Sequence, residues 1–196
     1  NNMHQREAGI KDGKRDCIAY MARYSYPQLF NADAERFGLP EHEYELLEAY
    51  YDNAYKMHEH MIQTGALYTL MEINWTGRPQ LDYMDHLPEN KGMRGRSIYP
   101  RDKEGKLGMG YEMIHQLHEW ALANDITILT GCEAKQILTD STGMVTGLKV
   151  QVGGREKKLM ARKGVIFGSG GYSHNSDLML RWQRGPHYGG CSVPTN

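Results

Sequence analysis

The residues best suited to chemistry form a glycine-rich segment late in the sequence. An apolar run from Gly164 to Phe167 predicts a buried strand, and it leads directly into the stretch 168–171, which reads Gly-Ser-Gly-Gly. Glycine backbone lets amide groups approach a phosphate or a ribityl chain closely, and the helix expected over 173–182 would add a favourable dipole. By itself the pattern is about equally typical of a tight turn between a strand and a helix.

Histidines give a weaker signal. His58 and His60 flank Glu59, but residues two apart point in different directions on a helix, so they do not suit a shared metal ion. His115 and His118 share a helix face, yet no third ligand is visible near them in the sequence. The sequence therefore predicts no metal site.

A turn-rich stretch carries two arginines and a tyrosine that could face a ligand. Arg94 or Arg96 could bind a carboxylate through two hydrogen bonds, with Tyr99 nearby. A solvated loop arginine is the commoner situation, and we favour it here. Tyrosines are also frequent from Tyr20 to Tyr55, and a tyrosine could serve as a general acid, but the spacing singles out none. The catalytic residues stay unknown at this stage.

The first half of the chain has a helical pattern. Asp12 is expected to cap a helix that runs through Tyr24. A long helix is expected from Glu41 to Thr64, with Gly65 ending it, because apolar residues recur at three- and four-residue spacing. Residues 66–105 are rich in turn signals and predict an irregular, functional segment.

The second half alternates between helix and strand patterns. An amphipathic helix is expected from Gly108 to Asn124. A turn at Asp140–Gly143 separates two of the strands that follow, and Gly153–Gly154 makes another turn. Strands are expected at 126–130, 134–138, 144–152, 158–160 and 163–167.

Composition narrows the function classes. The 23 Lys and Arg nearly balance the 24 Asp and Glu, which gives a net charge of -1 and indicates neither nucleic acid nor an anionic membrane as partner. Three distant cysteines argue against a disulfide framework. No apolar run reaches the roughly 18 residues of a membrane span. We expect a cytoplasmic protein, with a periplasmic location still open.

Two further stretches extend the pattern around the glycines. Residues 142–148 read Thr-Gly-Met-Val-Thr-Gly-Leu, and residues 163–175 read from Lys-Gly-Val-Ile-Phe through the glycines to Asn175. Near the start, Ala8-Gly9-Ile10 precedes an acidic helix start, and 44–47 lead toward Thr64-Gly65-Ala66. In the order of its expected elements and in these motifs, the chain resembles an internal part of the fumarate reductase and succinate dehydrogenase flavoproteins. The resemblance is closer to the 3-ketosteroid dehydrogenases.

The resemblance implies an α+β fold and FAD as cofactor. Residues 1–106 would form a mostly helical part of the cap or substrate domain, and residues 107–196 a helix and small β-sheet from an FAD-binding α/β domain. Ala134 matches a position where the family's backbone contacts the FAD adenine. The remaining cofactor-binding positions would be Gly168, Ser169, Gly170, Gly171, Tyr172 and Asn175.

The resemblance also implies an activity. Hydride would move between flavin and a carbon–carbon bond next to a carbonyl or carboxylate, on a steroid-like ketone or a dicarboxylate. The family's GxGxxG fingerprint is absent from the chain, so we expect an interior piece of a larger enzyme, inactive in isolation. A non-catalytic α/β module that binds a nucleotide or a protein is the alternative. A homo-oligomer formed through exposed apolar surfaces also stays open.

Overall fold

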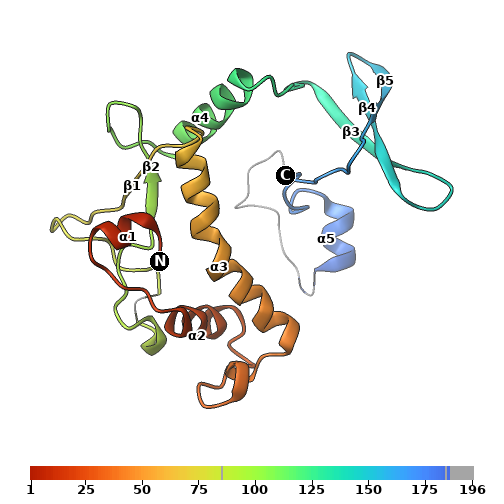
Figure 1. Cartoon of the computed structure of the whole chain (residues 1–196). Helices are drawn as coiled ribbons and strands as arrows, with labels where there is room; N and C mark the ends of the chain where they lie inside the picture. Colours follow the sequence, from red (N-terminus) through yellow and green to blue (C-terminus); the bar gives the residue numbers. More distant parts are fainter. Residues whose placement is uncertain (85, 184, 186–196) are drawn as a thin grey trace. The chain divides into compact units, whose positions relative to one another are not determined.

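The computed structural model describes residues 1–84, 86–183 and 185, and it divides into two compact units. Unit 1 comprises Asn1–Ile128 and unit 2 comprises Leu129–Asn196 (Figure 1). Helices and small antiparallel sheets occur together among the described residues, which confirms the predicted α+β class. The predicted assignment of 1–106 to a cap and of 107–196 to an FAD-binding domain stays a prediction.

Unit 1 is mostly helical, as the periodicity predicts. Its short β-strands β1 and β2 pair antiparallel, with Leu70 opposite Tyr99. Its described elements, in chain order, are α1 (Met3–Glu7), α2 (Lys14–Ser25), η1 (Glu35–Gly38), α3 (Glu41–Gln63), β1 (Thr69–Met71), η2 (Pro88–Asn90), β2 (Ile98–Pro100) and α4 (Gly110–Ala123). None of the described helices combines the length and apolarity needed to cross a membrane.

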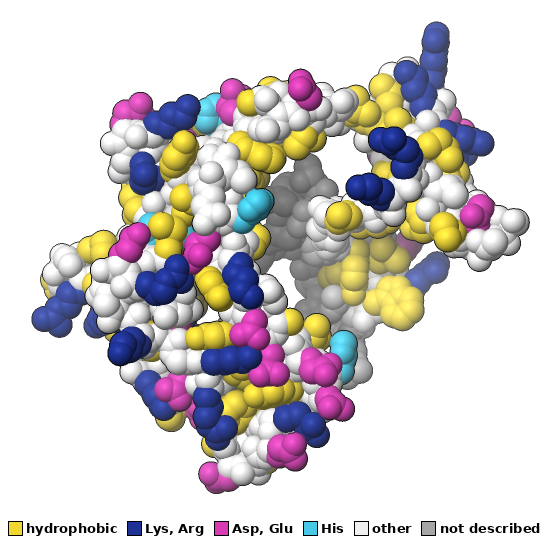
Figure 2. Space-filling view, in the orientation of Figure 1, with side chains coloured by type: hydrophobic (Ala, Val, Ile, Leu, Met, Phe, Trp, Pro, Cys, Tyr) yellow, Lys and Arg dark blue, Asp and Glu magenta, His cyan; other side chains and the backbone are white. Residues whose placement is uncertain are grey.

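The core of unit 1 lies where α2 packs on α3 and η1. Ile18 and Ala22 of α2 are almost completely buried against Phe37 and Leu39. Partly buried side chains of α3, among them Tyr44, pack around this cluster. The outer surface in this region mixes both charge signs, as Figure 2 shows, which fits the near-zero net charge.

Helix α3 ends as the sequence predicts. Gly65 adopts a left-handed backbone with φ +73°, which glycine reaches without strain. The Gly65 amide donates to Ile62 O at 3.0 Å, and the Ala66 amide donates to Met61 O at 2.8 Å. These bonds satisfy carbonyls that have no partner inside the helix. The chain can therefore reverse directly into β1.

The predicted role of Asp12 is wrong. Helix α2 begins after Gly13, which makes no side-chain cap, and Asp12 lies one residue before it. The Asp12 carboxylate is 3% exposed and is bound by the guanidinium of Arg96. A buried carboxylate is stabilised more by a guanidinium than by a backbone amide at an exposed helix start, because burial raises the cost of an unpaired charge.

Unit 2 is built on a meander of three antiparallel strands. β3 (Cys132–Thr139), β4 (Val145–Val152) and β5 (Arg155–Met160) lie in the order β3-β4-β5. The predicted turn joins β3 to β4: the Asp140 carboxylate accepts hydrogen bonds from the Thr142 amide at 2.8 Å and the Met144 amide at 3.1 Å. Helix α5 (Ser176–Trp182) falls inside the predicted 173–182 segment.

Two predicted strands are wrong. Residues 126–130 and 163–167 form no strand and pair with none among the described residues. Ile166 is 99% exposed and Phe167 is 54% exposed, so this apolar run is not buried as its composition predicts. An apolar run becomes a strand only when another strand completes its hydrogen bonds, and a local pattern cannot specify that partner.

Gly147 allows β4 and β5 to approach closely. A Cβ atom at this position would lie 2.1 Å from the carbonyl oxygen of Leu159 on the neighbouring strand. Its backbone φ is not in the left-handed region, so the requirement is for space alone. Gly147 is therefore a packing glycine within the sheet.

We predict that Gly147→Val destabilises unit 2 by about 2–3 kcal/mol or more, because the added side chain must push β5 away. Denaturant unfolding followed by circular dichroism would measure the loss. The matched control is Gly168→Ala, since a Cβ at Gly168 meets open space. Equal stability of the two variants would contradict the close approach.

Candidate functional site

The glycine segment of unit 2 leaves its backbone open. A Cβ atom at Gly168 or Gly171 would have no atom within 4 Å. Gly170 has φ +75°, a conformation that other residues adopt only with strain. A ligand could therefore approach the backbone at Gly168 and Gly171 without meeting other side chains of the described structure. This geometry fits an extended cofactor that binds through main-chain contacts.

The end of this segment forms a turn into α5. The Asn175 amide donates to Tyr172 O at 2.9 Å, and Asn175 Oδ1 accepts from the Leu178 amide at 3.0 Å. The side-chain oxygen Oδ1 of Asn175 thus caps α5, while its side-chain nitrogen Nδ2 takes no part in that bond. Tyr172 is 38% exposed. Six of the seven predicted cofactor residues therefore lie together on one segment.

The seventh predicted residue, Ala134, lies on β3 of the same unit. It stands opposite Val150 of β4, which is 2% exposed. The register between the two strands shifts between Ala134 and Gln136. Such an irregularity disrupts the ladder and leaves backbone groups for other partners. The part of Ala134 in cofactor binding stays a prediction.

Unit 1 has a concave region beside the β1–β2 ribbon that polar and apolar side chains line together. It has a volume of about 570 Å³. The Tyr99 hydroxyl donates to Glu72 Oε1 at 3.0 Å, and this bond raises the pKa of Tyr99. Tyr83 is 93% exposed and therefore has a free face for a ligand. The lining residues are Glu72, Gln80, Leu81, Asp82, Tyr83, Ser97, Ile98 and Tyr99.

Arg96 anchors the segment that carries these tyrosines. Its Nε and Nη2 donate to the two Asp12 oxygens at 2.7 and 2.8 Å, and its Nη1 donates to Asp82 Oδ2 at 2.7 Å. The guanidinium also lies 5.0 Å from the centre of the Tyr20 ring. Burial opposes its charge, but the bonds to Asp12 and Asp82 outweigh burial and raise the pKa of Arg96.

The expectation of a solvated loop arginine is therefore wrong for Arg96, whose side chain is 15% exposed. Neither is it free to bind a substrate carboxylate, because two carboxylates already occupy its donors. Arg94 is also engaged, since its Nη1 donates to Pro79 O at 2.7 Å. Both arginines shape the segment from 79 to 99, which leaves the exposed phenol of Tyr83 as the donor in this region that can meet a ligand.

A second concavity in unit 1 is mainly apolar. It has a volume of about 390 Å³ between α2, α3 and β2, and tyrosine and methionine side chains of α3 line much of it. Cys17 also lines it, and burial raises the pKa of this thiol to about 11, so it stays protonated and unreactive. Within the described part of the chain, no group of three His, Cys, Asp or Glu is arranged to hold a metal ion.

Comparison with known families bears on the open glycine backbone. The family described as FAD binding domain matches residues 30–195, which include the segment 168–171 and the whole three-stranded sheet. The chain belongs to the FAD-binding domain family. Membership confirms the flavoprotein resemblance inferred from the motifs and indicates FAD as the cofactor.

The relatives and solved structures that match this chain include ketosteroid dehydrogenases. The 3-oxosteroid 1-dehydrogenase of Comamonas testosteroni is 30% identical over 66 residues, which are 33% of this chain and 12% of that protein. Two solved structures share the fold, each with a TM-score of 0.66 and 18% identity over 92% of this chain. They are a 3-ketosteroid-Δ4-(5α)-dehydrogenase from Rhodococcus jostii RHA1 and a 3-ketosteroid Δ1-dehydrogenase from Sterolibacterium denitrificans.

The present chain is much shorter than these proteins. It spans 38% of the Rhodococcus chain and 41% of the Sterolibacterium chain. The Rhodococcus structure holds 4-androstene-3,17-dione and the Sterolibacterium structure holds 1,4-androstadiene-3,17-dione. These ligands belong to the neighbours, and the likeness at this identity concerns the fold.

Two features of unit 1 were not predicted from the sequence: the exposed position of Tyr83 and the pairing of Asp12 with Arg96. Tyr83 stands in a turn-rich stretch and has no motif around it that marks a ligand contact. The partners Asp12 and Arg96 are 84 residues apart in the chain, so no local pattern pairs them. No local signal in the sequence marks Arg96 as buried, since Arg94 and Arg101 lie in the same stretch.

We predict that Arg96→Met destabilises the protein by about 3–5 kcal/mol, because it leaves the Asp12 carboxylate buried without a partner. Denaturant unfolding would measure the change. Lys14→Met is the matched control, since Lys14 pairs with Glu48 and Asp52 on the surface and its loss should change stability little. The double variant Asp12→Asn/Arg96→Met should recover part of the loss, and failure to recover any would place the cause elsewhere.

Proposed function

We propose that this chain is part of an FAD-dependent oxidoreductase that acts on a carbon–carbon bond next to the carbonyl of a steroid-like ketone. The observation that carries the proposal is the family match over residues 30–195, which coincides with an open glycine backbone at 168–171. The 30% sequence identity over 66 residues with a 3-oxosteroid 1-dehydrogenase supports a ketone substrate in preference to a dicarboxylate.

Unit 2 would hold the cofactor. The main chain at Gly168, Gly170 and Gly171 would lie along FAD, and the Ser169 hydroxyl could donate or accept a hydrogen bond there. Tyr172, Asn175 and Ala134 would complete the contacts. When bound, FAD supplies a hydride acceptor or donor at its flavin ring.

Unit 1 would supply polar contacts for the substrate carbonyl. Tyr83 presents an exposed phenol in this concave region, whereas the only hydroxyl proton of Tyr99 is already donated to Glu72. A phenol that donates to a carbonyl stabilises the negative charge that develops on the oxygen when the neighbouring carbon loses a proton. Arg96 would act as a positioning residue, since it fixes Asp82 beside Tyr83.

The cofactor proposal predicts that Gly170→Val lowers FAD affinity at least tenfold, because valine cannot adopt φ +75° without strain and its side chain covers the backbone. Flavin absorbance and fluorescence titration should be measured on this chain and on the natural polypeptide that contains it. Gly110→Ala is the control, since a Cβ there meets open space in unit 1. No flavin binding by either wild-type protein would leave a non-catalytic module as the better assignment.

The substrate proposal predicts that Tyr83→Phe lowers kcat on 4-androstene-3,17-dione by about 100-fold or more in the FAD-loaded polypeptide, because a proton donor is lost. Reduction of an artificial electron acceptor would report the activity. Tyr24→Phe is the control, since its phenol is 57% exposed on α2 and outside the concave region. Unchanged kcat in Tyr83→Phe would remove Tyr83 from the proposed machinery while leaving FAD binding intact.

A further inference from the structure

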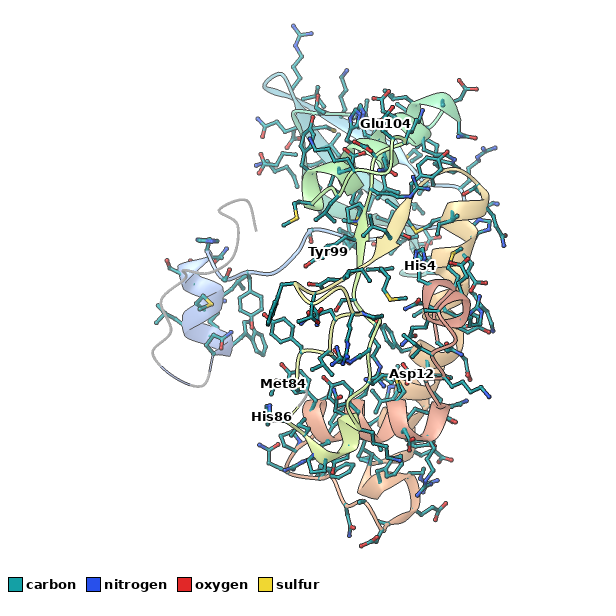
Figure 3. All side chains as sticks on the ribbon, turned by 90° about the vertical axis from the view of Figure 1, so that its left-hand side faces the viewer. His4, Asp12, Met84, His86, Tyr99 and Glu104 are labelled. Carbon is teal, nitrogen blue, oxygen red and sulfur yellow. The ribbon has the colours of Figure 1, made fainter. Side chains whose placement is uncertain are left out.

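One buried hydroxyl in unit 1 joins two histidines from different helices. Thr69 Oγ1 of β1 lies 2.9 Å from His4 Nε2 of α1 and 2.8 Å from His58 Nε2 of α3. Thr69 and His58 are 7% and 6% exposed. The proposed function uses none of these side chains, and Figure 3 shows His4 on the side of the β1–β2 ribbon away from Tyr99.

The hydroxyl has one proton, so it donates to one neutral imidazole and accepts from the other. His58 Nδ1 is buried and, among the described residues, has no hydrogen-bond partner. An unpaired N–H is costlier there than an unpaired lone pair, so the His58 proton belongs on Nε2. The two hydrogen bonds then run in one direction: His58 Nε2–H donates to Thr69, and Thr69 donates to His4 Nε2. The remaining His4 proton sits on Nδ1, 3.6 Å from the Glu7 carboxylate.

An added proton has only two places to go, and each damages this arrangement. At His4 Nε2 it makes both histidines donors to Thr69 Oγ1, and the buried Thr69 hydroxyl proton then loses its acceptor. At His58 Nδ1 it creates a buried donor without a partner in the described structure. Burial and then the neighbouring charge of His4 lower the pKa of His58, while Glu59 opposes that shift. Glu59 is itself paired with Arg6 of α1, which limits its help.

The other charged groups around this cluster do not replace the lost bonds. Glu7 lies on the outer side of His4, with its side chain 65% exposed. Asp12 and Arg96 line the same concavity as His58 but are bound to one another. Acid therefore weakens the junction of α1, α3 and β1 rather than strengthening it.

Helix α1 in turn holds part of the segment that leads to Tyr99. Asn2 Nδ2 donates to Gly95 O at 2.9 Å, and Gln5 Nε2 donates to Arg94 O at 2.8 Å. Gln5 is 1% exposed, so its bond is protected from water. Release of α1 would leave both carbonyls without these donors and would loosen 94–95.

We propose that His58, Thr69 and His4 form an acid-sensitive latch, which holds α1 and the segment 94–95 against β1 near neutral pH and releases them in mild acid. Because the folded state lowers the pKa of His58, its contribution to stability is present above the ordinary histidine value of about 6.5 and is lost as the pH falls below it. The latch needs no flavin, so its test is independent of the proposed function.

The test is amide hydrogen exchange of the whole chain at about pH 7.5 and about pH 5.5, corrected for intrinsic exchange. Protection of α1 and of 94–95 should fall about tenfold or more in acid, while α2 keeps its protection as the internal reference. Equal α1 protection at the two pH values overturns the proposal.

Two variants separate the latch from a general effect of acid. Thr69→Ser keeps the hydroxyl and should keep the pH dependence. Thr69→Val is isosteric and should show weak α1 protection at both pH values; a wild-type profile in Thr69→Val overturns the proposal. Should Thr69→Val fail to fold, nitrogen-15 spectra of the wild-type histidine rings decide, since His58 must carry its neutral proton on Nε2 and His4 on Nδ1. A proton on His58 Nδ1 overturns the latch.

Discussion

The charge of Asp12 is the constraint on which most of unit 1 depends. A carboxylate that is 3% exposed must be paired, and its only described ionic partner is Arg96, which comes from 84 residues further along the chain. The same guanidinium binds Asp82 and lies on Tyr20 of α2. One cation thus ties the start of α2 to the long turn-rich segment, which has little regular structure of its own to hold it in place.

This arrangement explains how an irregular stretch can present defined side chains. Residues 72–97 contain few backbone ladders, so side chains must satisfy and position the chain there. The guanidinium holds the segment from one side, and the amides of Asn2 and Gln5 hold it from another. Ligand-facing residues such as Tyr83 then gain a fixed backbone while remaining exposed, which is a common division of labour in binding sites.

Regular elements were predictable where the local pattern was long. The 23-residue helix α3 and its left-handed Gly65 follow from periodicity and glycine physics, and the Asp140 turn follows from its residue types. Strands were wrongly predicted at 126–130 and 163–167 because a strand depends on a distant partner, which the local sequence does not specify. For the same reason the pairing of Asp12 with Arg96 was beyond the sequence, whereas the glycine segment at 168–171 was recognisable from a contiguous motif.

The partly buried thiol of Cys17 can report chemically on the opening of unit 1. Its partial burial and a pKa of about 11 keep it from alkylating reagents, whereas Cys132 belongs to the other unit. Any transient separation of α2 from α3 exposes Cys17 to solvent as an ordinary thiol. The rate at which a maleimide labels this position therefore counts the openings of unit 1 without a single engineered residue.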